Sequence, residues 1–225
     1  LLAAVLAMGT LAGCGGGAEE SSGEDTQASE ETDDILGDGV FTVGFDAEYP
    51  PFGYMDDEGE YVGFDLDLAK AVCDAKGWEF EAKPVNWDAK DSELNSGTID
   101  CIWNGFTING REDDYTWSDP YLDNEQVIVV KADSGIESLE DLAGKAVVVQ
   151  AASAALDALN NEDNKDLTAS FGSLTENPDY NTAFMNLESG AADAVAIDIG
   201  VANYQLEQRE QGAYVILDEP IQSEQ

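Results

Sequence analysis

The chain has 225 residues, of which 48 are acidic and 9 are basic, and it contains no histidine. Its formal net charge of −39 argues against the basic patches that bind nucleic-acid phosphates or anionic lipid headgroups. We interpret the excess acid mainly as a solvated surface, with attraction of cationic solutes as a weaker alternative.

The first residues predict an export signal. Residues 1–11 are almost wholly apolar, but they are too few for a stable transmembrane helix, which needs about 20 residues. We therefore predict a signal peptide over residues 1–13. The sequence Leu11-Ala12-Gly13-Cys14 resembles the bacterial lipobox, which implies a lipid on Cys14 that anchors the exported chain at the outer face of the bacterial cell membrane. The alternative is an incidental cysteine at the end of a cleaved signal.

Residues 15–34 consist of Gly, Ser, Thr, Gln, Asp and Glu, with alanine as the only apolar residue. Such a composition cannot bury a core. We predict a lipidated, disordered tether over residues 14–36 that holds the folded part away from the membrane. The remainder is long enough for two modest lobes.

The first part of the remainder alternates short strands with helices. Apolar residues recur at helical spacing over 64–76, whereas apolar and charged residues alternate over 78–82. The predicted order is strand 41–45, a turn with Pro50 and Pro51, helix 64–76, strand 78–82, helix 89–95 and strand 99–103. A β-α-β-α-β order is typical of a mainly parallel sheet covered by helices.

A second set of elements follows Pro120. We predict strand 127–130, a helical turn over 138–142 capped by Ser138, strand 145–150, helix 153–160, a weak strand 167–171, helix 180–189, strand 193–198, helix 199–208 and strand 214–217. The simplest account is an α/β protein with a first lobe over 37–121 and a second lobe over 122–221, each a mainly parallel sheet flanked by helices. A cleft between two such lobes is a common place for a small ligand.

Two cysteines follow Cys14. Cys73 and Cys101 form no Cys-x-x-Cys pair, and without histidine there is no support for a zinc site or for Cys–His catalysis. We expect no metal and no cofactor. Two interpretations of these cysteines stay open: a disulfide in an oxidising compartment, or two small buried apolar residues.

Several motifs then occur in a fixed order, and together they resemble the polar amino-acid-binding proteins of ABC importers, the extracellular solute-binding protein family 3. They are Phe45-Asp-Ala-Glu-Tyr-Pro-Pro-Phe52, Gly63-Phe-Asp-Leu-Asp-Leu-Ala69, Asn104-Gly-Phe-Thr-Ile108 with Arg111, Trp117-Ser-Asp-Pro-Tyr121, Ser138-Leu-Glu-Asp-Leu-Ala-Gly-Lys145 and Ala192-Asp-Ala-Val-Ala-Ile-Asp198. The resemblance covers the chain from Val40 onward. It implies the type 2 periplasmic-binding-protein fold.

The resemblance also implies function and partners: a monomeric, exported receptor that binds an amino acid and passes it to a membrane permease. In that family the chain crosses back after a segment like 219–225 and completes the first lobe. We therefore expect residues 222–225 to start this return crossing, with the C-terminal part of the first lobe missing.

Arg111 occupies the place where the family binds the ligand's α-carboxylate. A guanidinium presents two parallel donors that match a carboxylate, which lysine does not. The resemblance adds the Thr107 hydroxyl and the main chain of Asn104 and Gly105 to this part of the site. The alternative is a surface arginine that pairs with a neighbouring acidic residue, Glu112 or Asp113.

Asp198, at the end of a strand in the second lobe, takes the family's position for binding the ligand's α-ammonium, because a desolvated ammonium needs a charged acceptor. The alternative is an N-cap for the helix that follows. Ser153 and Ala154 open a helix whose free N–H groups could meet the ligand carboxylate. Gln150 would line the same wall.

Asp46, Tyr49 and Trp87 correspond to the family's pocket for the ligand side chain. Aromatic faces sandwich an aliphatic stem or a cation, and Asp46 would accept a hydrogen bond from an amide or ammonium. Core packing is the alternative for the two aromatic residues. The combination favours a polar or basic amino acid without choosing one.

Two other functions are weighed against the receptor. A cyclohexadienyl or arogenate dehydratase on the same fold would need a glutamic acid in the cleft as general acid, and the motifs place only Glu48 near it. A sensor-kinase ectodomain fits a lipid-tethered chain poorly. We therefore expect a binding protein and not an enzyme.

Overall fold

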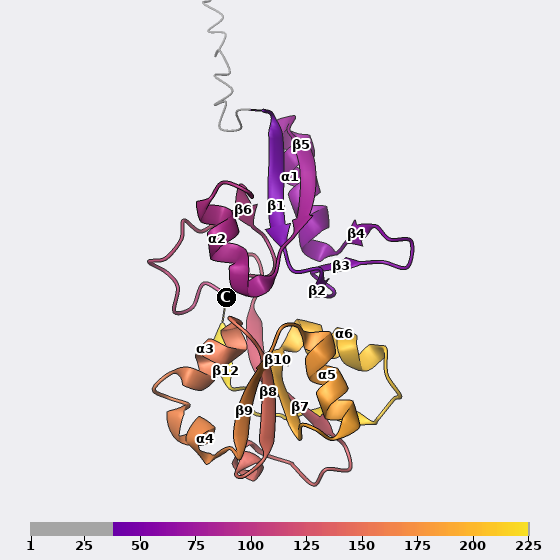
Figure 1. The fold of residues 1–225 in the computed structure, drawn as a ribbon, viewed down its shortest axis with the longest axis vertical. Coiled ribbons are helices and arrows are strands. Elements are labelled where there is room, and N and C mark those ends of the chain that lie inside the picture. The colour runs from indigo at the N-terminus through magenta and orange to yellow at the C-terminus, as the bar shows by residue number, and fades with distance from the viewer. Residues whose placement is uncertain (1–37, 225) are drawn as a thin grey trace, which may run out of the picture. The chain divides into compact units, whose positions relative to one another are not determined.

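The computed structural model describes residues 38–224, which form two lobes, each with its own sheet (Figure 1). The predicted signal peptide (1–13), tether (14–36) and lipidation site Cys14 lie outside the described residues. No helix within residues 38–224 is long and apolar enough to cross a membrane.

The first lobe is built on a three-stranded parallel sheet. Its central strand β1 (Val40–Phe45) pairs with β5 (Glu79–Pro84) on one side and with β6 (Cys101–Ile102) on the other. Helix α1 (Phe64–Lys76) ends at Gly77 in the left-handed conformation that glycine adopts without strain. The short helices η1 (Trp87–Ala89) and α2 (Lys90–Asn95) precede β6. This confirms the predicted β-α-β-α-β order.

A small antiparallel sheet between β1 and α1 was not predicted. It consists of β2 (Glu48–Tyr49), β3 (Gly53–Met55) and β4 (Tyr61–Val62), where the sequence indicated only a turn. Strands of two or three residues are too short to show alternation. The sheet presses against Gly63, where an added Cβ would lie 2.2 Å from the Phe52 carbonyl oxygen. Glycine at this position lets the backbone approach that closely.

The second lobe holds a mixed sheet with the strand order β11-β7-β10-β8-β9. Strand β8 (Ala146–Gln150) is parallel to β9 (Ser173–Asn177) and β10 (Ala194–Asp198). Strand β7 (Asn124–Lys131) is antiparallel to β10, β11 (Tyr214–Ile216) and β12 (Gln222–Glu224). The expectation of a mainly parallel sheet is therefore wrong for this lobe, because β7 runs against its neighbours.

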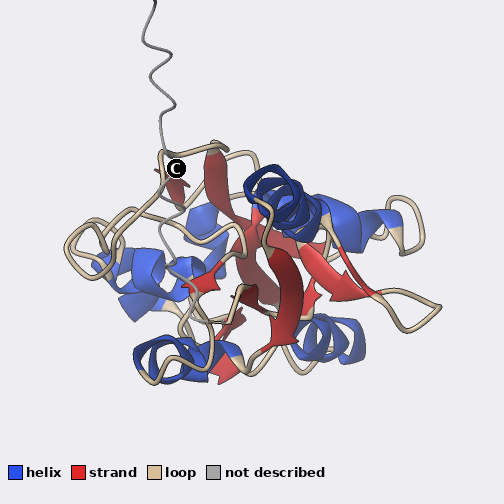
Figure 2. Cartoon of the chain, turned by 90° about the horizontal axis from the view of Figure 1, so that it is seen from above, coloured by secondary structure: helices blue, strands red, loops and turns tan. Residues whose placement is uncertain are grey.

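Helices cover both faces of this sheet (Figures 1 and 2). Helices α3 (Ala154–Asn160) and α4 (Lys165–Ser170) lie on one side, and α5 (Tyr180–Ser189) and α6 (Ile199–Glu207) on the other. Alternate strand residues supply the two cores: Val129 and Ile197 pack with α5 and α6, whereas Ile128 and Ala196 pack with α3. The turn η2 (Leu139–Leu142) carries the predicted Ser138 cap in a capping box with Asp141.

One predicted strand is a helix. Residues 167–171 were expected to be extended, but most of them belong to α4, and the strand β9 follows instead. Leu167 and Phe171 are four residues apart, the spacing of one helix face, and both pack against the core on the α3 side. The apolar pair was too short a signal to distinguish the two periodicities.

The two cysteines of the first lobe are free thiols. Cys73 is buried on α1, and Cys101 is partly buried on β6. Burial raises the pKa of Cys101 to about 12, with a smaller contribution from Asp100. Of the two interpretations of these residues, the structure contains the packed, unpaired one.

Candidate functional site

The site is a small cavity lined by residues of both lobes. Ten of the eleven predicted ligand-binding residues line it, together with Phe106: they are Tyr49, Trp87, Asn104, Gly105, Thr107, Arg111, Gln150, Ser153, Ala154 and Asp198. Asp46 borders an adjoining hollow and bonds to Gln150. The predicted residues are thus brought together from segments more than 100 positions apart in the chain.

Arg111 reaches from the first lobe to the second. Its Nη2 donates to Oδ2 of Asp157 at 2.6 Å, and its guanidinium carbon lies 4.9 Å from the centre of the Phe106 ring. The Arg111 side chain is only 11% exposed, whereas that of Asp157 is 60% exposed. The predicted alternative, a surface pair with Glu112 or Asp113, is therefore wrong, because the ion pair joins the two lobes.

Asp198 is 3% exposed at the end of β10, where two amides hold its carboxylate. Asn124 and Gln126 donate to its Oδ1 at 2.6 and 2.7 Å. Burial raises the pKa of Asp198, while hydrogen bonds from Tyr49, Gln126 and Asn124 act in the opposite direction. The residue stands at the N-cap position of α6, but its side chain makes no capping bond. The carboxylate faces the cavity instead.

Asp46 follows β1 and connects the lobes through a second polar contact. Gln150 Nε2 donates to Asp46 Oδ2 at 2.6 Å, while the side chain of Asn104 accepts from the Asp46 backbone N–H at 2.9 Å. Ser153 caps α3 by accepting from Leu156 N, and its hydroxyl donates to the Gln150 carbonyl. These bonds fix the walls on either side of the cavity.

The aromatic residues both pack and line the cavity. Tyr49 stacks on Phe52 and lies 5.9 Å from the Tyr180 ring, within the core cluster of the second lobe. Trp87 packs edge-on against Phe106, and its indole N–H donates to the Ala152 carbonyl at 3.2 Å. Tyr49 and Trp87 therefore pack against other aromatic residues, as the alternative interpretation expected, and both also line the cavity.

Known proteins resemble this chain in sequence and in fold. The sequence model of the bacterial extracellular solute-binding proteins, family 3, matches residues 41–182. The chain belongs to this family. The arginine-binding extracellular protein ArtP of Bacillus subtilis is 34% identical over 162 residues, a match that covers 71% of this chain and 61% of ArtP. The chain spans less than two thirds of the length of the first curated relatives it matches.

Solved structures agree with the family. An ABC uptake transporter substrate-binding protein from Streptococcus pneumoniae with bound histidine has a TM-score of 0.79 at 33% identity, covering 84% of this chain and 78% of that one. The ancestral amino acid-binding protein AncCDT-1, described as a precursor of cyclohexadienyl dehydratase, has a TM-score of 0.75 at 33% identity, covering 86% and 82%. The predicted type 2 periplasmic-binding-protein fold is thereby confirmed.

Several residues that shape the site of this family 3 solute-binding protein were not predicted. They are Phe106, Asp157, Asn124, Gln126 and Glu224. Asn124 and Gln126 alternate along β7, but the predicted strand began only at residue 127. Asp157 stands four positions after Ser153, on the same face of α3, which is the one local signal that pointed to the cavity.

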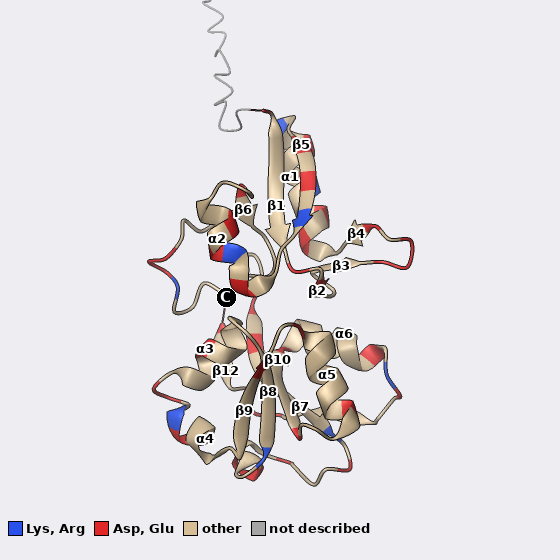
Figure 3. Ribbon diagram, viewed as in Figure 1, with Lys and Arg blue, Asp and Glu red and all other residues tan. Residues whose placement is uncertain are grey.

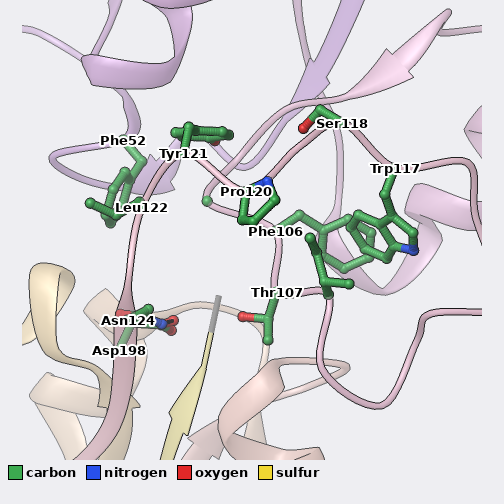
Figure 4. A pocket seen from close by; sticks show the side chains of 12 residues that line it. Phe52, Phe106, Thr107, Trp117, Ser118, Pro120, Tyr121, Leu122, Asn124 and Asp198 are labelled. Carbon is green, nitrogen blue, oxygen red and sulfur yellow. Dashed lines mark hydrogen bonds between the residues drawn. The ribbon is translucent and has the colours of Figure 1, made fainter.

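A second, more apolar cavity adjoins the first in the family 3 fold (Figure 4). Phe106, Trp117, Pro120 and Tyr121 surround its upper part, while Thr107, Asn124 and Asp198 lie at its lower end. The yellow strand β12 ends between Thr107 and Asn124 in this view. Polar groups of the candidate site therefore gather where β7 begins and where β10 and β12 end.

Aspartate and glutamate positions are more frequent than lysine and arginine positions along both lobes of this family 3 protein (Figure 3). The described arginines, Arg111 and Arg209, each pair with a carboxylate, and only Arg111 lines the candidate cavity. Among residues 38–224, Arg111 is therefore the arginine available to the cavity, and it is only 11% exposed.

Asp46 gives the first testable prediction for this family 3 protein. Burial is the main cause that raises the pKa of Asp46 to about 6, whereas hydrogen bonds from Glu48 and Gln150 lower it. Because the folded-state pKa lies above the unfolded value, the protonated form favours folding, and this contribution is lost as the pH rises from about 4 through 6. We expect the free energy of unfolding of the wild type, relative to Asp46→Asn, to fall by on the order of 2 kcal/mol over that range.

Urea unfolding of both proteins at several pH values measures this difference. Asp88→Asn, an exposed carboxylate within helix η1 that borders the same hollow as Asp46, is the control and should leave the pH dependence unchanged. A constant difference between wild type and Asp46→Asn across this range would contradict the prediction.

Proposed function

We propose that this chain binds an amino acid between its two lobes and delivers it to the membrane permease of an ABC importer. The observation that carries the proposal is that Arg111 of the first lobe and Asp198 of the second line one cavity. A guanidinium and a carboxylate on opposite walls match the two charged ends of a zwitterion. Relatives named for binding arginine and histidine support the same ligand class.

In this proposal Arg111 binds the ligand's α-carboxylate. Phe106 and the Asp157 pair hold the guanidinium flat, and its remaining N–H groups are donors for the ligand. Thr107 supplies a hydroxyl, and the main chain at Asn104 and Gly105 completes this wall. All three are cavity-lining residues.

Asp198 binds the α-ammonium, since it is a buried carboxylate already oriented by two amides. The side chain of the ligand lies against Tyr49 and Trp87, with Asp46, Gln150, Ser153 and Ala154 on the adjoining wall. Polar groups on this wall favour a polar or basic amino acid.

Ligand binding favours the closed arrangement of the lobes. Contacts between the lobes already include Arg111 with Asp157, Gln150 with Asp46, and Asn181 with Glu48. A ligand held by both lobes adds further bonds that exist only when they are together, so it shifts the population by its differential affinity. The closed form is the one that would meet the permease.

The family and the first residues support a cellular location and a set of partners for this protein. We propose an exported monomer, anchored through a lipid on Cys14 at the outer face of the bacterial membrane, without cofactor and without nucleic-acid partner. Membership of a family of extracellular solute-binding proteins supports export. Mass spectrometry of the protein from membranes would detect the lipid on Cys14.

A dehydratase is the competing function, and a fold neighbour and a buried glutamate favour testing it. The fold neighbour AncCDT-1 is described as a precursor of such an enzyme, and Glu224 is a buried glutamate that lines a hollow sharing Asn124 with the apolar cavity. Glu48, the glutamate that the motifs indicated, is exposed and bonds to Asn181. Release of phenylpyruvate from prephenate or phenylalanine from arogenate would establish the enzyme, and its absence is expected here.

A thermal-shift screen of the twenty amino acids, with cystine and ornithine, tests the binding proposal. Ligand that binds only the folded protein stabilises it by mass action, by about 3 kcal/mol at a concentration a hundred times Kd. We expect a concentration-dependent rise in Tm for a polar or basic amino acid. No shift with any of them at millimolar concentration would refute the proposed function.

A further inference from the structure

The ends of three strands bring polar side chains onto one face of the second sheet. Asp198 of β10 is opposite Gln126 of β7, and Asn124 of β7 is opposite Glu224 of β12. Directly opposed residues, and residues two apart on one strand, lie on the same face of a sheet. Glu224 and Asp198 therefore flank β7 on the face that carries the amides of Asn124 and Gln126.

Glu224 is only 4% exposed, and neither of its carboxylate oxygens has a hydrogen-bond partner among residues 38–224. Oε1 of Gln126, next to it, is likewise buried without a donor in the described chain. The amide nitrogen of Gln126 is already used by Asp198. Three buried acceptor atoms thus lack a donor in full hydrogen-bond geometry, although the side chains of Thr107 and Gln126 lie near enough to lower the pKa of Glu224. Buried acceptors in this state are costly and uncommon.

A partner with several donors and a positive charge would satisfy all three acceptors together. An ammonium group has three N–H donors, no acceptor and one positive charge. From this geometry we infer that Glu224, with Oε1 of Gln126, completes the ammonium subsite beside Asp198 and takes direct charge-assisted hydrogen bonds from the bound amino acid's primary ammonium. This inference rests on the proposed function and names a binding residue that the sequence motifs did not include.

The charged groups around Glu224 fit this role. Burial raises the pKa of Glu224 to about 7, and the Asp198 carboxylate adds to the rise, whereas Thr107, Gln126 and the Arg111 guanidinium lower it. Tyr49 of β2 and Tyr180 of α5 also face it, and the Glu224 carboxylate contributes to raising the pKa of both phenols. An ammonium beside Glu224 favours its ionised form, so binding below about pH 7 must expel a proton.

The test compares wild type with Glu224→Gln, which keeps the shape and mimics the protonated acid. Affinity for the amino acid identified by the thermal-shift screen is measured by titration calorimetry at about pH 8 and about pH 5.5. We expect Glu224→Gln to weaken binding at least about tenfold at the higher pH and by clearly less at the lower pH. Glu219→Gln, an exposed acid five residues earlier, should match the wild type at both.

A second measurement can be made on the wild type alone, with Glu224→Gln as a comparison. Calorimetry in buffers of different ionisation enthalpy at about pH 6.5 should show proton release by the wild type and less release by Glu224→Gln. Equal affinity of wild type and Glu224→Gln at about pH 8 would overturn the inference and leave the proposed function standing. Failure of the wild type to bind any amino acid would overturn both.

Discussion

Arg111→Ala is expected to weaken binding of the amino acid at least about 100-fold, or about 3 kcal/mol. The guanidinium is the cavity's candidate for a two-point contact with a carboxylate, and nothing on the opposite wall replaces its charge in the residues that the structure describes. Arg111→Lys should recover only part of the loss, because an ammonium lacks the planar pair of donors. Titration calorimetry with the ligand found in the screen measures both variants.

Arg209→Ala is the matched control for this result. Arg209 also pairs with a carboxylate, Glu188 at 2.7 Å, and lies over a phenylalanine ring, but it is outside the cavity. It therefore reports the cost of losing such a pair without losing a ligand contact. If Arg111→Ala bound the amino acid as tightly as Arg209→Ala, the proposed role of Arg111 in the site would be wrong.

Asp198→Asn should weaken binding about as much as Arg111→Ala does, without lowering the stability of the protein. Losing the negative charge removes the acceptor for the α-ammonium, so we expect binding to weaken about 100-fold. The asparagine oxygen can still accept from Asn124 and Gln126, which keeps the wall in place. Because burial raises the pKa of Asp198, the neutral variant should be at least as stable as the wild type at pH 7.

Calorimetry for affinity and urea unfolding for stability separate these two outcomes. Asp133→Asn, an exposed carboxylate in the loop after β7, is the control for removing one negative charge from so acidic a chain. A loss of binding in Asp198→Asn accompanied by unfolding would assign the residue to structure. Full affinity would remove it from the site.

In the proposed site, Arg111 and Glu224 bind opposite ends of a zwitterion. Arg111 stands on a first-lobe loop and is tied to the second lobe through Asp157. Glu224 and Asp198 belong to strands of the second sheet. A ligand that satisfies the donors of one lobe and the acceptors of the other stabilises their contact, which is the physical basis expected of a closing receptor.

The sequence by itself determined the order of most elements and the candidate residues of the site. The spacing of apolar residues along a segment reflects which of its residues are buried. It therefore predicts strands such as β8 and helices such as α5 from the local sequence alone. Arg111 was identifiable because an arginine is rare in this chain and follows a recognisable motif. Short motifs were therefore enough to predict the candidate site residues before the fold was known.

Tertiary structure alone decided which of those groups meet and how they are charged. The partner of Arg111 is Asp157, 46 positions away, and that of Asp46 is Gln150, 104 positions away. Spacing along a segment fixes only which face a side chain occupies, whereas such contacts depend on the path of the whole backbone. The direction of β7, the helix in place of a strand at 167–171, and the unpartnered carboxylate of Glu224 arise from packing between distant segments, and no local pattern encodes them.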